Sequence, residues 1–444
     1  MPSTPKIILP LLLIYFSLCA TAQPVPAVPD TFASSNPFIS WAKGHALPLQ
    51  HSDAEKGDAD LNPIQKMIGT ARVVALGEPA HGVHEPLAFR NRLFRFLVEN
   101  ARFTTLVVEA GLAESRLAAD FVATGVGTAE AAAANLTIGK PSPENIALLE
   151  WMRQYNADPG HKRKVKFYGM DMQLKGFPGD TRPSHAALDE ALSYLKRVDT
   201  SAANQVTTAL SPYMSRLSVA GYASFSTAEH EKLTAIFDDI VALFERQRIA
   251  FIKNGALKDY EWAYRNAIVA LQTDRMARLL PPDQPGKIPP DAWMSMNSRD
   301  AAMAENVMWI LNTQAEQGRV LVYAHNAHVK NAPTTGGVWD AFAQPPNSTG
   351  QYLRSLLGKD FFIIGSSVEP QIATAQPGSL DKALATVGKP RFILDLSTAS
   401  ENPLVTNWLS VRRPMEANKV GYLMLPTSTA FDAVLFLGNA AGDK

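Results

Sequence analysis

A short apolar run that ends in a turn rich in ionisable side chains constrains the fold of this chain most strongly. Residues 73–76 are Val-Val-Ala-Leu and predict a buried strand. Pro79 biases Glu78 toward extended geometry, so the strand stops there, and Pro86 is typical of a first helical position. The loop between strand and helix lies at the carboxyl end of the strand, where α/β sheets usually bind ligands. This loop carries Glu78, His81, His84 and Glu85.

Strand and helix signals alternate along much of the chain. Helical patterns at 86–100, 112–123 and 143–156 separate the first predicted strands. This alternation predicts an α/β fold with a largely parallel central sheet covered by helices. Apolar runs predict the strands at 72–76, 104–108, 165–170, 320–324, 361–364, 392–396 and 433–437.

The strand signal disappears between residues 184 and 317. Leu188, Leu192 and Leu195 recur there at helical spacing. We therefore expect an all-helical insertion over 184–317 that forms a lid or a second lobe. It would divide the α/β core into a first part, 61–183, and a second part, 318–440. Long helices are predicted at 227–254, 257–280 and 298–316.

The first 22 residues resemble a secretory signal peptide. An apolar stretch is followed by Ala20-Thr21-Ala22, an A-x-A cleavage site, which predicts a periplasmic or secreted protein. Leu18 stands where lipidation at Cys19 would need a small residue, so we favour simple export. Cys19 is the only cysteine, so the mature chain would have no disulfide and no thiolate nucleophile. Residues 23–60 are rich in Pro, Ala, Ser and Asp and predict a loosely ordered N-terminal segment, although Phe38 to Trp41 could pack on the body.

The charge balance argues against a nucleic-acid partner. The chain has 42 basic and 42 acidic residues and a formal net charge of zero, whereas nucleic-acid binding normally requires a basic surface. No further candidate for a membrane span follows the signal peptide, so we expect no stable membrane insertion after its cleavage. The expected partner is a small-molecule substrate.

Ionisable side chains end four of the predicted strands. In a parallel sheet these ends share one edge, so the side chains should meet in a common crevice. Arg90 lies one turn into the first helix and is expected to reach back over the His81 loop. The strand-end side chains are Glu78 and His81, then Glu109, then Asp171, and finally His325 and His328.

The ordered set of motifs resembles the erythromycin esterase family over about residues 65–440. These motifs are Gly77-Glu78-x-x-His81-Gly82-x-x-Glu85 with Arg90, Val108-Glu109-Ala110, Gly169-x-Asp171, Arg299-Asp300-x-x-Met303-Ala304-x-Asn306 and Ala324-His325-Asn326-x-His328. The resemblance implies hydrolysis of a macrolide lactone or a related ester. It also implies that His81 is the main catalytic base, that Glu78 and Glu109 assist it, and that Arg90, His325 and His328 line the same site.

A mechanism without a serine nucleophile fits these residues best. No strand end carries a Gly-x-Ser-x-Gly elbow. We therefore expect His81 to deprotonate water, with Glu78 or Glu109 fixing its tautomer, and Arg90 with either His325 or His328 stabilising the oxyanion. The side chains expected to contact the substrate are His328, His84, Glu85 and Asp171.

Two alternatives remain open at this stage. The carboxylates and histidines could hold a divalent metal, as in a metal-dependent protease or amidase, although our prediction is that no cofactor is required. Pro79 argues against a helical di-iron arrangement of Glu78 and His81. An exported haem- or ligand-binding protein of similar fold would instead use Tyr168, Tyr323 and the histidine pair.

Overall fold

The computed structural model describes residues 36–53, 57–136, 140–172, 185–280, 289–314, 318–369, 372–418 and 421–438. The expected signal peptide, including Cys19, lies outside these residues. No helix in the described part is both long and apolar enough to cross a membrane.

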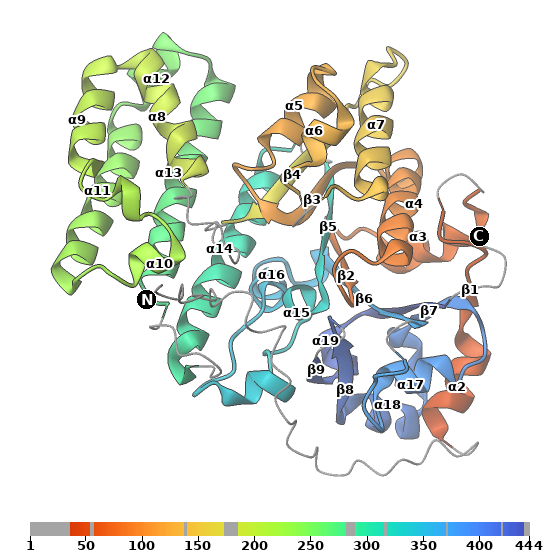
Figure 1. Ribbon diagram of the computed structural model, residues 1–444. Coiled ribbons are helices and arrows are strands. Elements are labelled where there is room, and N and C mark those ends of the chain that lie inside the picture. The colour runs from red at the N-terminus through yellow and green to blue at the C-terminus, as the bar shows by residue number, and fades with distance from the viewer. Residues whose placement is uncertain are drawn as a thin grey trace, which may run out of the picture.

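One large sheet organises the described chain (Figure 1). Its eight strands lie in the order β1-β7-β10-β6-β2-β5-β3-β4. From β10 onward in this order, each strand is parallel to the next one. Strand β7 is antiparallel to both of its neighbours, β10 and β1. The largely parallel sheet is thus confirmed, and all seven predicted strands are present. The strands are β1 (Leu47–Pro48), β2 (Val73–Glu78), β3 (Phe103–Gly111), β4 (Lys166–Asp171), β5 (Arg319–His325), β6 (Phe361–Val368), β7 (Arg391–Asp395) and β10 (Ala433–Leu437).

Helices cover both faces of the sheet (Figure 1). Both faces of the sheet are apolar and need such cover, as strand β2 shows. Val73 and Ala75 pack into the core on one face, and Val74 and Leu76 pack into the core on the other, because successive side chains of a strand point to opposite faces. The first core includes residues of α2 (Pro37–His45), α14 (Trp293–Asn312), α16 (Thr349–Leu357), α17 (Leu380–Ala385) and α18 (Pro403–Ser410). The second includes residues of α3 (Asn62–Ile68), α4 (His84–Ala101), α5 (Arg116–Thr124), α6 (Ala129–Ala133) and α7 (Pro143–Ala157).

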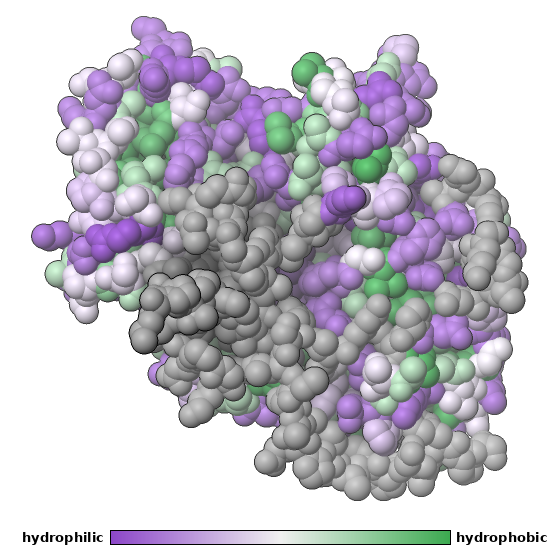
Figure 2. Space-filling model, viewed as in Figure 1, coloured by the Kyte–Doolittle hydropathy of each residue, from purple (hydrophilic) through white to green (hydrophobic). Residues whose placement is uncertain are grey.

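A separate helical lobe stands beside this body (Figure 1). Its own core is built from α8 (Ala186–Val198), α9 (Thr200–Leu210), α10 (Val219–Tyr222), α11 (Thr227–Arg246), α12 (Arg248–Asn254) and α13 (Leu257–Ala277). At the upper edge of the view in Figure 2, the surface dips between this lobe and helices α5, α6 and α7. The single helix predicted at 227–254 is wrong, because the backbone leaves helical geometry at Gln247. The bend brings Phe251 against Phe244, with ring centroids 5.7 Å apart.

The insertion expected at 184–317 would place α14 wholly in the helical lobe, but α14 also packs against the sheet. Met303 and Val307 pack into the core of the sheet, while Ala302 and Trp309 pack against the lobe. The helix therefore joins the two parts, because two of its faces are apolar.

Within the N-terminal segment, the packing that sequence analysis allowed for Phe38 to Trp41 is present. Helix α2 buries Phe38 and Trp41, and Phe38 stacks on Trp408 with centroids 4.1 Å apart. A two-stranded hairpin of β8 (Arg412–Ala417) and β9 (Gly421–Pro426) was not predicted. Pro414 within β8 weakens its strand signal.

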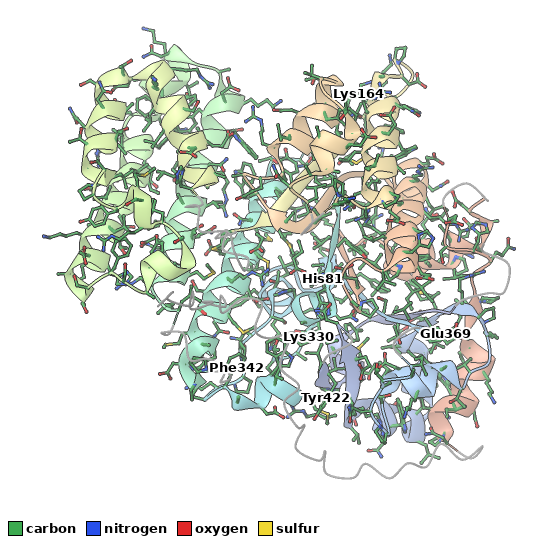
Figure 3. The ribbon with its side chains drawn as sticks, viewed as in Figure 1. His81, Lys164, Lys330, Phe342, Glu369 and Tyr422 are labelled. Carbon is green, nitrogen blue, oxygen red and sulfur yellow. The ribbon has the colours of Figure 1, made fainter. Side chains whose placement is uncertain are left out.

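The strand order reverses at β2 and β5, which places the site. Strands β2 and β5 are neighbours in the sheet. After β2 the chain passes through α4 to β3, which lies next to β5. After β5 it passes through α15 (Asn326–Val329) and α16 to β6, which lies next to β2 on the opposite side. Open α/β sheets bind ligands at such a reversal, at the carboxyl ends of the strands. Figure 3 shows His81 near the centre of the molecule.

Candidate active site

The strand register brings the first and the fourth strand ends together. Glu78, the last residue of β2, is the register partner of His325, the last residue of β5. Strand β3 shifts register against β4 between Val108 and Gly111, and such a bulge re-aims a side chain. Here Glu109 turns toward β5, and its Oε2 accepts a hydrogen bond from the backbone N–H of His325 at 2.9 Å.

A chain of hydrogen bonds runs from Tyr323 through Glu78 to His81. The Tyr323 hydroxyl donates to Glu78 Oε2 at 2.7 Å, and His81 Nδ1 lies 2.5 Å from Glu78 Oε1. Glu78 is buried, whereas the side chain of His81 is 50% exposed. In the described part of the chain, His81 Nε2 has no hydrogen-bond partner. Glu78 thus holds the imidazole through Nδ1, and Nε2 is left open.

The surroundings of His81 change its proton affinity. Partial burial alone would lower the pKa of His81, but the hydrogen bond to Glu78 and the charge of Glu109 outweigh it and raise that pKa to about 9. The imidazolium form is therefore strongly stabilised. Of the two carboxylates that sequence analysis left open as the partner of His81, it is Glu78 that contacts the ring.

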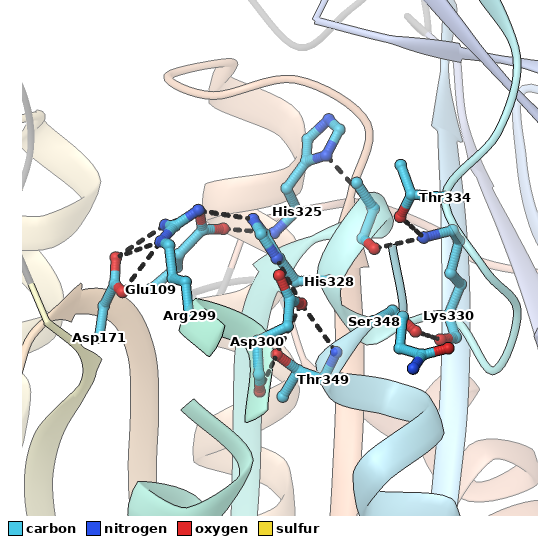
Figure 4. A network of polar contacts seen from close by, with 12 residues as sticks. Glu109, Asp171, Arg299, Asp300, His325, His328, Lys330, Thr334, Ser348 and Thr349 are labelled. Atoms are coloured by element: carbon cyan, nitrogen blue, oxygen red, sulfur yellow. Dashed lines mark hydrogen bonds and ion pairs between the residues drawn. The ribbon is translucent and has the colours of Figure 1, made fainter. Parts of the chain in front are cut away.

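Arg299 lies between the remaining carboxylates (Figure 4). Its Nε donates to Asp171 Oδ1 at 3.0 Å, and its Nη2 donates to Asp171 Oδ2 at 2.7 Å and to Glu109 Oε1 at 3.2 Å. Burial opposes ionisation, but the neighbouring cations hold the pKa of Glu109 well below its usual range. Asp171 is only 1% exposed, so it positions Arg299 and does not offer the surface expected of a substrate contact.

His328 forms a second buried charge pair in the same network (Figure 4). Its Nδ1 lies 2.8 Å from Asp300 Oδ1, and its Nε2 lies 3.3 Å from Glu109 Oε1. Burial would lower the pKa of His328, yet Asp300 and Glu109 raise it to about 9. Asp300 also accepts from the backbone N–H of Thr349 at 2.8 Å. His328 is therefore a fixed cation at neutral pH.

His325 is the opposite case. Its Nδ1 accepts from the backbone N–H of Ala327 at 3.2 Å, and its Nε2 faces the carbonyl oxygen of Pro79 at 3.1 Å. Burial and the charge of His81 lower the pKa of His325 to about 3. The ring is a neutral imidazole with both nitrogens engaged by the backbone, 5.2 Å between centroids from His81. It has no nitrogen left for an oxyanion or a haem iron.

Arg90 does not reach over the His81 loop as expected. Its Nη2 donates to Asn91 Oδ1 at 2.8 Å and to Asn145 Oδ1 at 2.9 Å, and its guanidinium lies 4.9 Å from the centre of the Tyr323 ring. The side chain is 2% exposed. Arg90 therefore stands behind Tyr323 and Glu78, where its charge acts on them from within the protein.

His84 and Glu85 also lie apart from the network. His84 Nδ1 is 2.6 Å from Glu144 Oε1 at the start of α7, and the His84 side chain is 59% exposed. Both residues belong to the first turn of α4, and His84 contacts Glu144 there instead of the residues at the strand ends. Among the residues that the structure describes, no hydrogen bond or ion pair joins either residue to His81, Glu109 or His328, so the substrate-binding role predicted for them lacks structural support.

The same side chains give little room for a metal. In the described part of the chain, no three or more His, Cys, Asp or Glu side chains are arranged to hold a metal ion. Arg299 contacts Glu109, Asp171 and His328, the donors that a metal would use. A required metal is therefore hard to accommodate, and the absence of a required cofactor stays a prediction.

Sequence reasoning missed three residues of this network. It named Arg299 and Asp300 only as part of a family motif, without a role in the site, and Tyr323 only as a possible haem ligand. The adjacent Arg299 and Asp300, followed by the apolar residues Ala301, Ala302 and Met303 of α14, were the available signal. Their partners, Asp171 and His328, could not be read from that signal.

Known proteins resemble this chain over most of its length. Residues 98–440 match the erythromycin esterase family; this match includes Glu109 and His328 but begins after His81. Erythromycin esterase type II of Escherichia coli is 26% identical over 344 residues, which cover 74% of this chain and 76% of that protein.

Solved structures share the fold. A Bacillus cereus protein of 27% sequence identity superposes with a TM-score of 0.76 and covers 91% of this chain and 98% of its own. A mutant of the erythromycin esterase EreC in its open conformation, 18% identical, gives a TM-score of 0.64 over 88% of this chain and 97% of its own.

Proposed function

The chain belongs to the erythromycin esterase family, and on this premise we propose that it is an exported hydrolase that cleaves a macrolide lactone or a related ester with water activated by His81. Family membership indicates a hydrolase. The observation that carries the finer proposal is the Glu78–His81 pair, a buried carboxylate on one ring nitrogen with the other nitrogen open.

The reaction follows from this geometry. Water bound at His81 Nε2 attacks the acyl carbon as the ring takes its proton, and Glu78 stabilises the resulting imidazolium. When the tetrahedral intermediate collapses, the bond to the alcohol oxygen breaks and Nε2 returns the proton to that oxygen. His328 lies close enough for its charge to lower the pKa of His81, and Arg299 contacts His328 and Glu109. Arg299 takes the place expected for Arg90, and of the two histidines left open His328 keeps a positive charge for the oxyanion, because both ring nitrogens of His325 are engaged by the backbone.

The substrate panel tests the proposal directly. We expect the chain without residues 1–22 to add one water to 14- or 16-membered macrolides or to simple aryl esters, seen as a mass gain in the product. If no ester in the panel is cleaved under any pH, the hydrolytic assignment of His81 is wrong. Finding the protein in a periplasmic or culture fraction, shortened near residue 22, tests export.

Activity should rise with pH. A general base must be neutral, and a pKa of about 9 leaves roughly one His81 ring in a hundred neutral at pH 7. We therefore expect kcat/KM to increase as pH rises toward about 9. In Glu78→Gln the charge that raises this pKa is removed, so the rise should occur at lower pH and reach a lower plateau, because a weaker base transfers the proton less well. An unchanged pH profile in this variant would contradict the role of Glu78.

Chelation should leave the activity intact. The guanidinium of Arg299 contacts the carboxylates that a metal would need, so we expect less than a twofold change, on the order of assay error, after extensive treatment with EDTA. Loss of activity that added zinc or manganese restores would favour the metal-dependent alternative.

A further inference from the structure

The loop that carries His81 is contacted from a distant part of the chain. The backbone N–H of His81 donates to Asn418 Oδ1 at 3.0 Å, and the backbone N–H of Asn418 donates to the carbonyl oxygen of Pro79 at 3.0 Å. Asn418 follows β8, in the turn of the hairpin that sequence analysis did not predict. These two bonds bracket the backbone between Pro79 and His81.

His325 holds the same peptide from another side. Its Nε2 lies 3.1 Å from the carbonyl oxygen of Pro79, which therefore accepts from both His325 and Asn418. The loop from Glu78 to His81 is thus clamped by β5 on one side and by the hairpin turn on the other. Its shape decides how closely His81 Nδ1 approaches Glu78 Oε1.

The backbone of Asn418 is suited to this contact. Its φ is +54°, in the left-handed region, where asparagine is one of the few residues with a side chain that is tolerated. The strand before it is anchored in the protein, because the backbone N–H of buried Glu416 donates to Asp381 Oδ2 at 2.8 Å. The carboxamide of Asn418 is therefore presented to the His81 loop from a fixed support.

We propose that Asn418 is a positioning residue for His81, which sets the contact between this imidazole and Glu78 by accepting the His81 backbone N–H. The effect of Asn418 on turnover rests on the proposed function. The effect of Asn418 on the geometry of the Glu78–His81 pair does not depend on that function.

The replacement Asn418→Gly removes the carboxamide but keeps the left-handed backbone and its N–H, since glycine adopts positive φ without strain. With the loop released, Glu78 Oε1 and His81 Nδ1 move apart, while Glu109, His325 and His328 still face the ring. We expect the pKa of His81, followed by NMR of ring-labelled histidine, to fall by about one unit or more. Asn418→Asp keeps an acceptor for the N–H and adds a negative charge near the ring, so it should not lower the pKa of His81.

Arg102→Gly is the matched control. Arg102 is the other residue with a side chain and positive φ in the described part of the chain, at 60°, and it ends α4 away from the site. Its replacement changes the backbone freedom of a left-handed position in the same way and should leave the His81 titration unchanged. An unshifted titration in Asn418→Gly would overturn the proposal, as would an equal shift in Arg102→Gly.

Two further measurements separate the possible failures. With an ester that the wild type cleaves, Asn418→Gly should lose about 10-fold to 100-fold in kcat with little change in KM, since a small misplacement of the base affects the chemical step. If no ester is cleaved, the proposed function fails while the titration still tests Asn418. If Asn418→Gly does not fold, hydrogen exchange in the wild type decides, because a fast-exchanging His81 amide would exclude the bond to Asn418.

Discussion

Replacing His81 with alanine should lower kcat on a cleaved ester by about 10²–10⁴-fold, the usual contribution of a general base. The Nε2 atom of the ring is open to water, and its Nδ1 is hydrogen-bonded to the Glu78 carboxylate, which raises the pKa of the ring. KM should change much less, because the loss concerns proton transfer and not ground-state binding. The measurement is steady-state kinetics at the pH optimum of the wild type.

His161→Ala is the matched control for this experiment. His161 stacks on Tyr155 with centroids 3.7 Å apart and precedes β4, so it lies at the amino edge of the sheet, opposite the site. This variant should keep the wild-type rate. Near-normal turnover by His81→Ala, in protein freed of wild-type contamination, would show that another group activates the water.

Replacing Arg299 with methionine should destabilise the fold by about 3–5 kcal/mol, because removing one partner of a buried ion pair leaves charges without compensation. Asp171 is 2% exposed in its side chain and Glu109 12%, and both lose the same guanidinium. Methionine keeps much of the side-chain volume, so the loss reports the charge and its hydrogen bonds. Urea unfolding followed by circular dichroism measures the effect.

Arg275→Met provides the comparison. Arg275 pairs with Asp238 on the surface of the lobe, with side chains 55% and 51% exposed, and such a pair contributes less than about 1 kcal/mol. Arg299→Lys should lie between the two, because an ammonium cannot bridge Asp171 and Glu109 as a guanidinium does. Equal losses in Arg299→Met and Arg275→Met would mean that the buried network contributes little to stability.

Much of the fold and part of the site could be predicted because they follow from local patterns. The apolar run before Glu78 predicted β2, and the run before Glu109 predicted β3, since burial of a strand is visible in its own residues. The hairpin β8–β9 was missed because Pro414 interrupts its pattern. The break at Gln247 was missed because Phe244 and Phe251 on its two sides both pack on Tyr194, some fifty residues earlier, and periodicity does not show that contact.

The sequence by itself determined the α/β class, the family resemblance and the set of ionisable residues that end the strands. Only the tertiary structure decided which groups each of them contacts and how these contacts shift its proton affinity. Glu78 contacts His81, and Arg299 contacts both Glu109 and Asp171. Burial and nearby charges lower the pKa of His325 and raise that of His328. His84 pairs with Glu144 instead of joining this network. Periodicity is a property of neighbouring residues, whereas a hydrogen-bond partner and a pKa depend on register, bulges and burial between segments that are far apart in the chain.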